Sequence, residues 1–296
     1  MLIRVTCVIL MLFWQVPVRA DETITIYTVN YPLKYFAENI AGKHADVVFP
    51  APADVDPAFW IPDTEAIIGY QQADIIFLNG ANYANWIRKV SLPQSSLLNT
   101  SEDFKESYIT VDDNVTHSHG LEGEHSHDST FFTTWLDFSQ AVKHARSIKA
   151  SLAARYPQFK DDFEKNFSHL EKELLALDEK LKALFPAQSQ FNLLASHPVY
   201  HYFARRYGLN IKSVLWEPDE VPTEQQWAEL KTIQSRHMAT VMLWEDHPNQ
   251  VTQDRLRELG IQSIVFDPCA NTCRKGGFLT AMQSNIERLA KVFLPD

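Results

Sequence analysis

Residues 158–184 read QFKDDFEKNFSHLEKELLALDEKLKAL, and this stretch decides how the chain is organised. Apolar side chains recur in it at spacings of three and four residues, which is the pattern of an amphipathic helix. These positions are Phe159, Phe163, Phe167, Leu170, Leu174, Leu177, Leu181 and Leu184. At about 1.5 Å per residue the helix is roughly 40 Å long. It is long enough to join two lobes, and Pro186 ends it.

Short apolar runs alternate with helical patterns on both sides of this helix, an order typical of parallel sheets covered by helices. Before it, we predict strands at residues 23–28, 45–49 and 74–78 and helices at 32–41, 63–72 and 139–154. After it, we predict strands at 191–195, 213–215, 240–244 and 263–266 and helices at 199–207, 223–235, 248–259 and 278–292. The predicted fold is α/β, with two parallel-sheet lobes joined by one long linking helix. The N-terminal lobe takes residues 21–157, the linking helix 158–185 and the C-terminal lobe 186–296.

Residues 1–20 have the pattern of a cleavable secretory signal peptide. Arg4 precedes an apolar run, and Val18 and Ala20 occupy the positions that a signal peptidase reads. An uncleaved anchor is the alternative, but the run is too short to span a membrane and Pro17 ends it abruptly. We therefore expect a periplasmic protein whose mature chain begins near Asp21.

The composition of the mature chain limits its partners. Removing Arg4 and Arg19 from the 27 basic residues leaves 25 against 37 acidic ones, a net charge of −12. This charge argues against nucleic acid or an anionic membrane surface and suits the attraction of cations. Two cysteines remain, Cys269 and Cys273. In an oxidising compartment a disulfide is the leading interpretation of this pair, and a thiolate metal pair is the alternative.

Residues 116–128 read THSHGLEGEHSHD and form a histidine-rich loop. Its four histidines are His117, His119, His125 and His127, and they stand beside three acidic residues. Imidazole and carboxylate groups are natural ligands of Zn²⁺ and similar ions. A solvated polar loop with incidental histidines is the alternative, but the paired H-x-H spacing favours metal contact.

Polar residues follow several predicted strands, where parallel sheets usually bind their ligands. In the C-terminal lobe these residues are His197, Glu245 and Asp267, and in the N-terminal lobe Asp54 and Asp56 follow a strand. Each alone has an ordinary explanation, since an aspartate before proline is typical of a turn and a histidine can cap a helix. Together they predict a site for a divalent cation between the lobes.

Several segments resemble a known family. They read DPAFWIP at 56–62, ADIIFLNG at 73–80, WLD at 135–137, SHPVYHYFARRYGL at 196–209 and FDP at 266–268. The layout resembles the zinc- and manganese-binding, ZnuA/TroA-type (cluster A-I) substrate-binding proteins of ABC transporters, over nearly all of the mature chain. The resemblance implies a metal held between the lobes by histidines of the first lobe and by a histidine or acid plus an acid of the second.

The chain departs from this family pattern at two ligand positions. Ala58 and Thr133 stand where the family carries its first and second ligand histidines, so only His197 and Asp267 carry over. Alanine cannot coordinate a metal, and a threonine hydroxyl is a poor zinc ligand. We expect imidazoles of the histidine-rich loop to complete the set, with Glu245 as a further donor. His201, one helical turn after His197, either lines the same site or has a structural role.

The resemblance implies a periplasmic solute-binding protein that captures Zn²⁺ for the membrane permease of an ABC transporter. Mn²⁺ or another divalent cation is the alternative metal. The alternative function is a periplasmic metal chaperone or buffer, or a family member that has lost inter-lobe metal binding. We expect a monomer that binds no nucleic acid. The sequence has no nucleophile–base motif and no phosphate-binding loop, and no set of three fixed ligands with a general base, so it is not predicted to be an enzyme.

Overall fold

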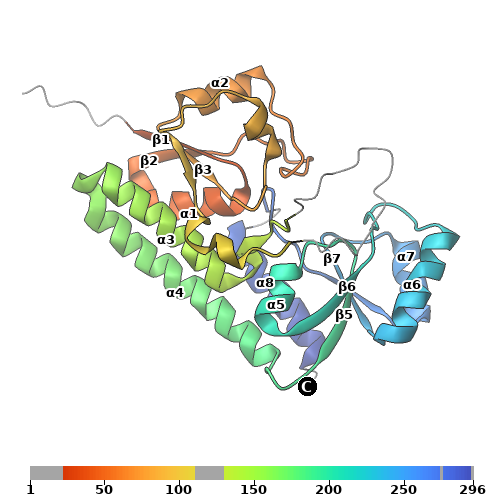
Figure 1. Cartoon of the computed structure of the whole chain (residues 1–296). Coiled ribbons are helices and arrows are strands. Elements are labelled where there is room, and N and C mark those ends of the chain that lie inside the picture. Colours follow the sequence, from red (N-terminus) through yellow and green to blue (C-terminus); the bar gives the residue numbers. More distant parts are fainter. Residues whose placement is uncertain (1–22, 111–129, 274–275, 295–296) are drawn as a thin grey trace, which may run out of the picture.

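The computed structural model describes residues 23–110, 130–273 and 276–294 (Figure 1). The predicted signal peptide and the histidine-rich loop at 116–128 lie outside the described residues. None of the described helices is long and apolar enough to cross a membrane.

The N-terminal lobe is built on a parallel sheet with the strand order β2-β1-β3-β4. Its strands are β1 (Ile24–Thr28), β2 (Ala45–Val48), β3 (Ile75–Leu78) and β4 (Leu97–Asn99). Its helices are α1 (Tyr31–Ala41), α2 (Thr64–Gln72) and α3 (Phe138–Arg155). Asn30, Asp63 and Asp137 begin these helices by accepting hydrogen bonds from backbone N–H groups of the first turn.

The C-terminal lobe repeats the arrangement with the strand order β6-β5-β7-β8, again parallel. Its strands are β5 (Phe191–Ala195), β6 (Leu209–Ser213), β7 (Val241–Trp244) and β8 (Gln262–Val265). Its helices are α5 (His201–Tyr207), α6 (Glu224–His237), α7 (Gln250–Glu258) and α8 (Gly277–Phe293). Short 3₁₀ helices occur at η1 (Gly42–His44), η2 (Asn85–Lys89), η3 (Glu102–Ser107), η4 (Thr134–Leu136) and η5 (Pro157–Phe159).

The linking helix α4 (Lys160–Leu184) packs against α1 and α3 of the first lobe and against α8 of the second (Figure 1). The apolar stripe predicted from the sequence is buried from Phe163 to Leu184, whereas Phe159 is only half-buried in η5. The fold of two parallel-sheet lobes and one long linking helix is therefore confirmed. The exact domain boundaries stay a prediction, because one buried cluster includes residues of both lobes.

The prediction of a strand at residues 213–215 is wrong, because the strand is β6 at Leu209–Ser213. Gly208 ends α5 in the left-handed conformation, with φ 67°, and the chain enters the strand at the next residue. The sequence analysis also missed β4, which has three residues and is too short for an alternating pattern to be recognised.

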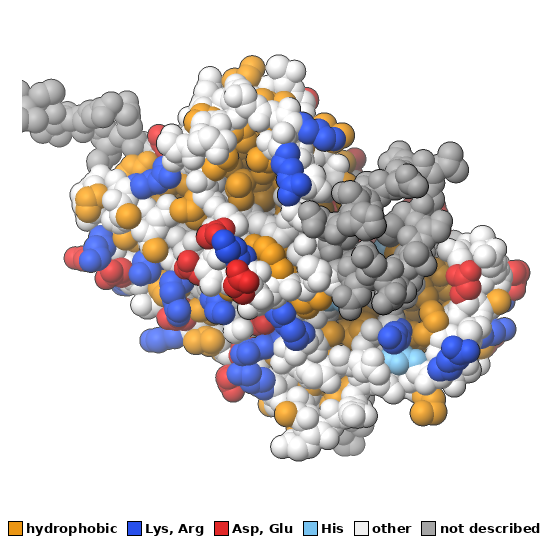
Figure 2. Space-filling view, in the orientation of Figure 1, with side chains coloured by type: hydrophobic (Ala, Val, Ile, Leu, Met, Phe, Trp, Pro, Cys, Tyr) orange, Lys and Arg blue, Asp and Glu red, His pale blue; other side chains and the backbone are white. Residues whose placement is uncertain are grey.

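Acidic and basic side chains are mixed on the outer face of α3 and α4, along the lower left edge of the molecule (Figure 2). Arg146 of α3 pairs with Glu171 of α4 at 2.7 Å. Exposed pairs of this kind contribute little to stability but keep such a helical face soluble.

The predicted disulfide between Cys269 and Cys273 is present, with a Cα–Cα distance of 5.5 Å. The loop that it closes contacts the N-terminal lobe. The Ala270 carbonyl accepts a hydrogen bond of 3.0 Å from the Tyr31 N–H at the start of α1. The Asn271 side-chain amide donates to the carbonyls of Pro52 and Val55, at 2.7 Å each. The disulfide loop therefore holds the segment of the other lobe that precedes Asp56.

We expect Asn271→Ala to lower the free energy of unfolding by about 0.5–1.5 kcal/mol, because two backbone carbonyls that are partly open to solvent lose their donor in the other lobe. Urea denaturation followed by circular dichroism measures the change. Asn210→Ala is the matched control, since the Asn210 amide donates to Asn192 on the exposed surface, and it should change stability by less than about 0.5 kcal/mol. Equal effects of the two substitutions would contradict the role of Asn271 in holding the lobes together.

Candidate metal centre

His197 lies just beyond the carboxyl end of β5, where the sequence predicted a metal ligand. Its Nδ1 atom is 3.0 Å from Oε1 of Glu245, and its Nε2 atom is 3.3 Å from Oε1 of Glu217. The imidazole is 19% exposed, whereas the side chains of Glu245 and Glu217 are 32% and 60% exposed. A largely buried imidazole thus has a carboxylate on each side.

The sheet itself produces this arrangement. In the C-terminal lobe β5 lies between β6 and β7. Glu217 follows β6, and Glu245 comes directly after the last residue of β7. Because parallel strands end at the same edge of the sheet, the residues that follow β6 and β7 flank the residue that follows β5. His197 and Glu245 are in contact, and their role as metal ligands stays a prediction. The sequence analysis missed Glu217.

The two carboxylates control the charge of His197. Burial alone would lower the pKa of this imidazole, because it disfavours the charged form. The negative charges of Glu245 and Glu217, which both contact the ring, outweigh burial and raise the pKa above its usual value. The imidazole therefore carries a proton more readily than a free histidine, and a divalent cation competes with that proton for the same site.

Asp56 brings the N-terminal lobe to this cluster. Its carboxylate accepts a hydrogen bond of 2.9 Å from the Ala58 N–H, although much of the residue stays open to solvent. Burial of the carboxylate oxygens raises the pKa of Asp56, and the hydrogen bond from Ala58 partly opposes this. The negative charges of Glu245 and Glu217 raise the pKa further, whereas the charge of His197 lowers it. The first lobe thus contributes a carboxylate whose pKa responds to the charges around the second lobe's histidine.

Ala58 and Thr133 occupy buried positions, with exposures of 7% and 3%. The Thr133 hydroxyl donates a hydrogen bond across the lobes to the Val199 carbonyl. The residue that replaces a family histidine therefore joins the two lobes. The Trp135 indole N–H does the same, donating at 2.8 Å to the Pro268 carbonyl.

Asp267 is held within its own loop at the end of β8. Its Oδ1 atom accepts a hydrogen bond of 2.7 Å from the Cys269 N–H, and its backbone N–H donates to Asn285 of α8 at 3.1 Å. Its charge and that of Glu245 both act on the buried hydroxyl of Tyr200, which burial already gives a raised pKa. Asp267 is therefore in the neighbourhood of the cluster, and its role as a ligand stays a prediction.

His201 has a structural environment. Its ring stacks on Phe131 with a centroid distance of 3.4 Å. Burial lowers the pKa of His201 to about 4, against a weaker opposing contact with the Pro198 backbone. Stacking between the lobes favours the structural interpretation of this histidine over the ligand interpretation.

Within residues 23–110, 130–273 and 276–294, no three His, Cys, Asp or Glu side chains are grouped closely enough to hold a metal ion. The candidate site there consists of His197 and its two flanking carboxylates, with Asp56 and Asp267 nearby. His117, His119, His125 and His127 lie outside the described residues, so their part in the site stays a prediction.

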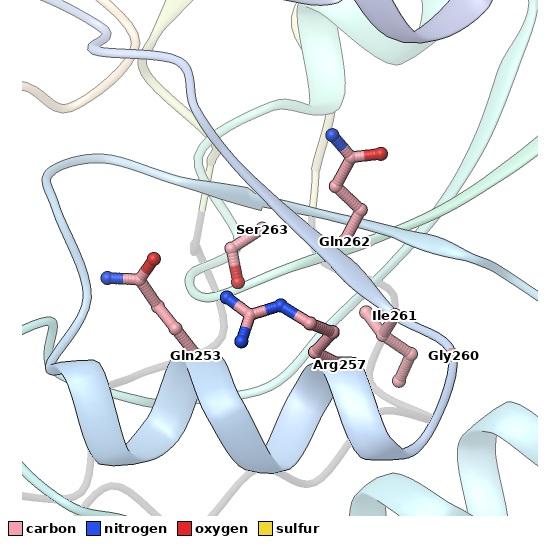
Figure 3. A pocket seen from close by; sticks show the side chains of 6 residues that line it. All are labelled: Gln253, Arg257, Gly260, Ile261, Gln262 and Ser263. Carbon is pink, nitrogen blue, oxygen red and sulfur yellow. The ribbon is translucent and has the colours of Figure 1, made fainter.

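A separate hollow of about 480 Å³ lies between α7 and the start of β8 (Figure 3). The side chains of Gln253, Arg257 and Ser263 point toward it from its two sides. Arg257 pairs with Asp254 at 2.7 Å and is 70% exposed. This hollow lies at the amino end of β8, opposite the edge that carries Asp267, and it offers guanidinium and amide groups, which are not zinc ligands.

A family model described as "Zinc-uptake complex component A periplasmic" (ZnuA) matches residues 26–292. The chain belongs to this family. Similar curated proteins include the zinc-binding lipoprotein AdcA of Streptococcus pneumoniae, 26% identical over 289 residues, covering 92% of this chain and 56% of AdcA. Another is the high-affinity zinc uptake system protein ZnuA of Bacillus subtilis, 25% identical over 286 residues, covering 90% of this chain and 87% of that protein. The ZnuA-family chain thus spans little more than half the length of the AdcA proteins.

Solved structures agree with the fold. The Zn(II)-bound ZnuA-like domain of Streptococcus pneumoniae AdcA matches with a TM-score of 0.77 and 22% identity, covering 92% of this chain and 99% of that one. The metal-dependent lipoprotein YcdH of Bacillus subtilis matches with a TM-score of 0.75 and 22% identity, covering 90% and 97%. At this identity the ZnuA-family chain shares the two-lobed architecture with both.

Proposed function

We propose that this ZnuA-family chain captures Zn²⁺ between its lobes in the periplasm and delivers it to the membrane permease of an ABC transporter. The observation that carries the proposal is His197, whose largely buried imidazole lies between two carboxylates at the carboxyl edge of a parallel sheet. Nitrogen and oxygen donors in this combination suit zinc. The zinc-binding names of AdcA and of the Bacillus subtilis ZnuA support the choice of metal.

The ligand set that we propose combines the two lobes and the histidine-rich loop. His197 supplies the central imidazole, and Glu217, Glu245 and Asp267 are the acidic residues around it. A zinc site usually has four ligands. Because Ala58 and Thr133 supply none, His117, His119, His125 and His127 are the proposed source of the missing imidazoles. Their segment ends a few residues before Thr133, which itself contacts the second lobe.

We expect His197→Ala to weaken zinc binding by more than about 100-fold, since loss of a residue that merely supports a ligand already costs about 10–100-fold. Changing all four loop histidines to alanine should also weaken binding. Competition with a chromophoric zinc chelator measures both affinities on the mature chain. His169→Ala is the matched control, because His169 is 77% exposed on α4, where it pairs with Glu173 of the same helix.

The possible results of this titration separate the functions. Unchanged affinity in His197→Ala together with lost affinity in the loop variant would place binding in the loop alone. That result would contradict capture between the lobes. Unchanged affinity in both variants would show that neither His197 nor the loop histidines bind zinc.

A metal chaperone or buffer is the second candidate function. It is favoured by the buried Ala58 and by the Thr133 hydroxyl, which is used in a hydrogen bond between the lobes. With no donor for zinc at either position, a weaker site of the loop and His197 would suit storage or exchange of metal. Delivery of bound zinc to reconstituted permease and ATPase, compared with delivery to an apo zinc enzyme, distinguishes the two functions.

A further inference from the structure

We propose that the disulfide between Cys269 and Cys273 is a redox-sensitive clamp between the two lobes, and that its reduction releases the loop at residues 268–271 from the first lobe. The contacts of this loop support the clamp. Its consequence for the metal, weaker zinc capture after reduction, rests on the proposed function. The reductant is a dithiol, a protein or small molecule with two neighbouring thiols.

Four hydrogen bonds connect this loop to the first lobe. The Pro268 carbonyl accepts one of 2.8 Å from the Trp135 indole N–H. The Ala270 carbonyl accepts one of 3.0 Å from the Tyr31 N–H. The Asn271 side-chain amide donates the other two to carbonyls of the first lobe, at 2.7 Å each. The residues on both sides of the first cysteine are thus bound to the other lobe, so the position of this short loop affects how the lobes are joined.

The disulfide anchors the loop on the second lobe. Cys269 is 1% exposed and belongs to the main buried cluster, whereas Cys273 is half-buried. The bond therefore ties the outer end of the loop to a buried residue. The Cys269 N–H also donates to the Asp267 carboxylate at 2.7 Å, which fixes the first residue of the ring. Ala270 and Asn271 lie inside the ring, so opening it gives them more freedom and their hydrogen bonds to the first lobe break more often.

Two features make this disulfide responsive to a reductant. Cys273 is the more exposed of the two cysteines, so its sulfur is the one that an external thiolate attacks. Cys269 has a φ of 56°, in the left-handed region that is costly for a residue with a β-carbon. Opening of the ring allows this backbone to relax. Exposed or strained disulfides are reduced more easily than ordinary structural ones.

The reaction is a thiol–disulfide exchange. A thiolate of the reductant attacks Sγ of Cys273, the bond between the two cysteines breaks, and Cys269 leaves as a thiolate that takes up a proton. The second thiol of the reductant then displaces Cys273 from the mixed disulfide. The reductant loses two electrons and two protons and closes its own disulfide, and the protein gains them as two thiols.

The Tyr31 N–H reports the state of the clamp. Tyr31 is the first residue of α1, and the first N–H groups of a helix have no acceptor within the helix. Its acceptor is the Ala270 carbonyl of the other lobe. The Leu33 N–H of the same helix is the matched control, because it donates to the Asn30 side chain of its own lobe at 3.0 Å. Release of the loop therefore exposes the Tyr31 N–H to exchange with solvent and leaves the Leu33 N–H protected.

The test measures amide hydrogen exchange by NMR in the metal-free mature chain. It compares the oxidised protein, the protein treated with dithiothreitol, and the double variant Cys269→Ser/Cys273→Ser, which has no thiols that could bind metal. In the last two we expect Tyr31 to exchange about 30-fold faster, the factor that corresponds to the loop-closure entropy of so short a ring. Leu33 should exchange at an unchanged rate. Alkylation followed by mass spectrometry verifies that the folded protein has been reduced.

The clamp would be overturned by a disulfide that survives excess dithiothreitol in the folded protein, or by unchanged exchange of Tyr31 after reduction. Equal acceleration at Leu33 would also overturn it, because the whole start of α1 would then be loosened. Zinc affinity, measured by chelator competition, should be about 10-fold weaker in the double variant, since the ring orients Asp267. Accelerated exchange with unchanged affinity would contradict the effect on zinc and support the clamp. Exchange at Tyr31 does not depend on zinc, so an oxidised chain that binds no zinc would overturn the proposed function alone.

Discussion

Replacing Asp178 by alanine should lower the free energy of unfolding by about 3–5 kcal/mol, the usual cost of breaking one side of a buried ion pair. Asp178 lies on the linking helix α4 and is 1% exposed. Its carboxylate accepts hydrogen bonds from Arg206 Nε at 3.0 Å and from a terminal guanidinium nitrogen at 2.6 Å. It also accepts one from the Tyr207 hydroxyl at 3.0 Å, and Lys182 lies 2.8 Å away.

Asp178→Ala lowers the stability because the former hydrogen-bond partners of the carboxylate remain in place without an acceptor. Without the carboxylate, the buried hydroxyl of Tyr207 and one side of the partly exposed Arg206 guanidinium lose their acceptor. Burial would raise the pKa of Asp178, but the hydrogen bonds from Arg206, Lys182 and Tyr207 outweigh it and lower the pKa. The carboxylate is therefore charged at neutral pH and fully engaged.

Urea denaturation of the two proteins measures the effect. Glu179→Ala is the matched control, because Glu179 is the next residue of the same helix, is 71% exposed and pairs with Lys182 at 2.9 Å. It should change the free energy of unfolding by less than about 0.5 kcal/mol. If Asp178→Ala destabilises the protein no more than this control, the network does not hold α4 to the second lobe.

This network joins three parts of the molecule that the site depends on. Arg206 belongs to α5, the helix that follows His197, and it also lies 3.6 Å from Asp137. Asp137 begins α3, which follows the Thr133 segment of the first lobe. The linking helix therefore fixes the relative position of the two segments that meet at the candidate site, through charged groups in addition to its apolar stripe.

The sequence predicted the features that follow from local patterns. The apolar stripe of α4 repeats over seven turns, so its burial could be read without knowing its partners. His197, Glu245 and Asp267 each follow a predicted strand, and the carboxyl edge of a parallel sheet collects such residues. The disulfide was predicted from the oxidising compartment and from the short spacing between the two cysteines.

The sequence could not predict contacts that depend on which segments meet. Asp178 interrupts no pattern in α4, and nothing in its neighbours shows that Arg206 and Tyr207 reach it. Glu217 comes four residues after the end of β6, so its position beside His197 depends on the path of the loop and not on the end of a strand. Asn271 is one polar residue in a short loop, and its partners lie more than 200 positions away in the chain.

A stability loss below neutral pH is expected from His144, which is fully buried in the first lobe. Its Nδ1 atom is 2.6 Å from the Thr100 hydroxyl, and its Nε2 atom is 2.8 Å from the Thr134 hydroxyl. Thr100 donates its own proton to the Leu78 carbonyl at 2.8 Å. Thr100 therefore accepts from Nδ1–H, and Nε2 accepts from Thr134, so both ring nitrogens are satisfied only when the imidazole is neutral.

Burial lowers the pKa of His144 to about 3, whereas the unfolded chain has a histidine pKa of about 6.5. Between these values the unfolded state binds the proton and the folded state does not. The contribution of His144 is therefore complete above pH 6.5 and is lost progressively as the pH falls toward 3. At pH 5 the loss attributable to this residue is about 2 kcal/mol relative to pH 8.

His144→Gln isolates this effect, because glutamine keeps a donor and an acceptor but does not titrate. The variant should be less stable at pH 8, since its hydrogen bonds are poorer. Its free energy of unfolding should then fall by about 2 kcal/mol less than that of the wild type between pH 8 and pH 5. His201, whose pKa is also lowered by burial, to about 4, contributes a similar loss to both proteins and cancels in the comparison. Urea denaturation at both pH values gives the four free energies, and parallel losses in the two proteins would show that His144 is not the group that titrates.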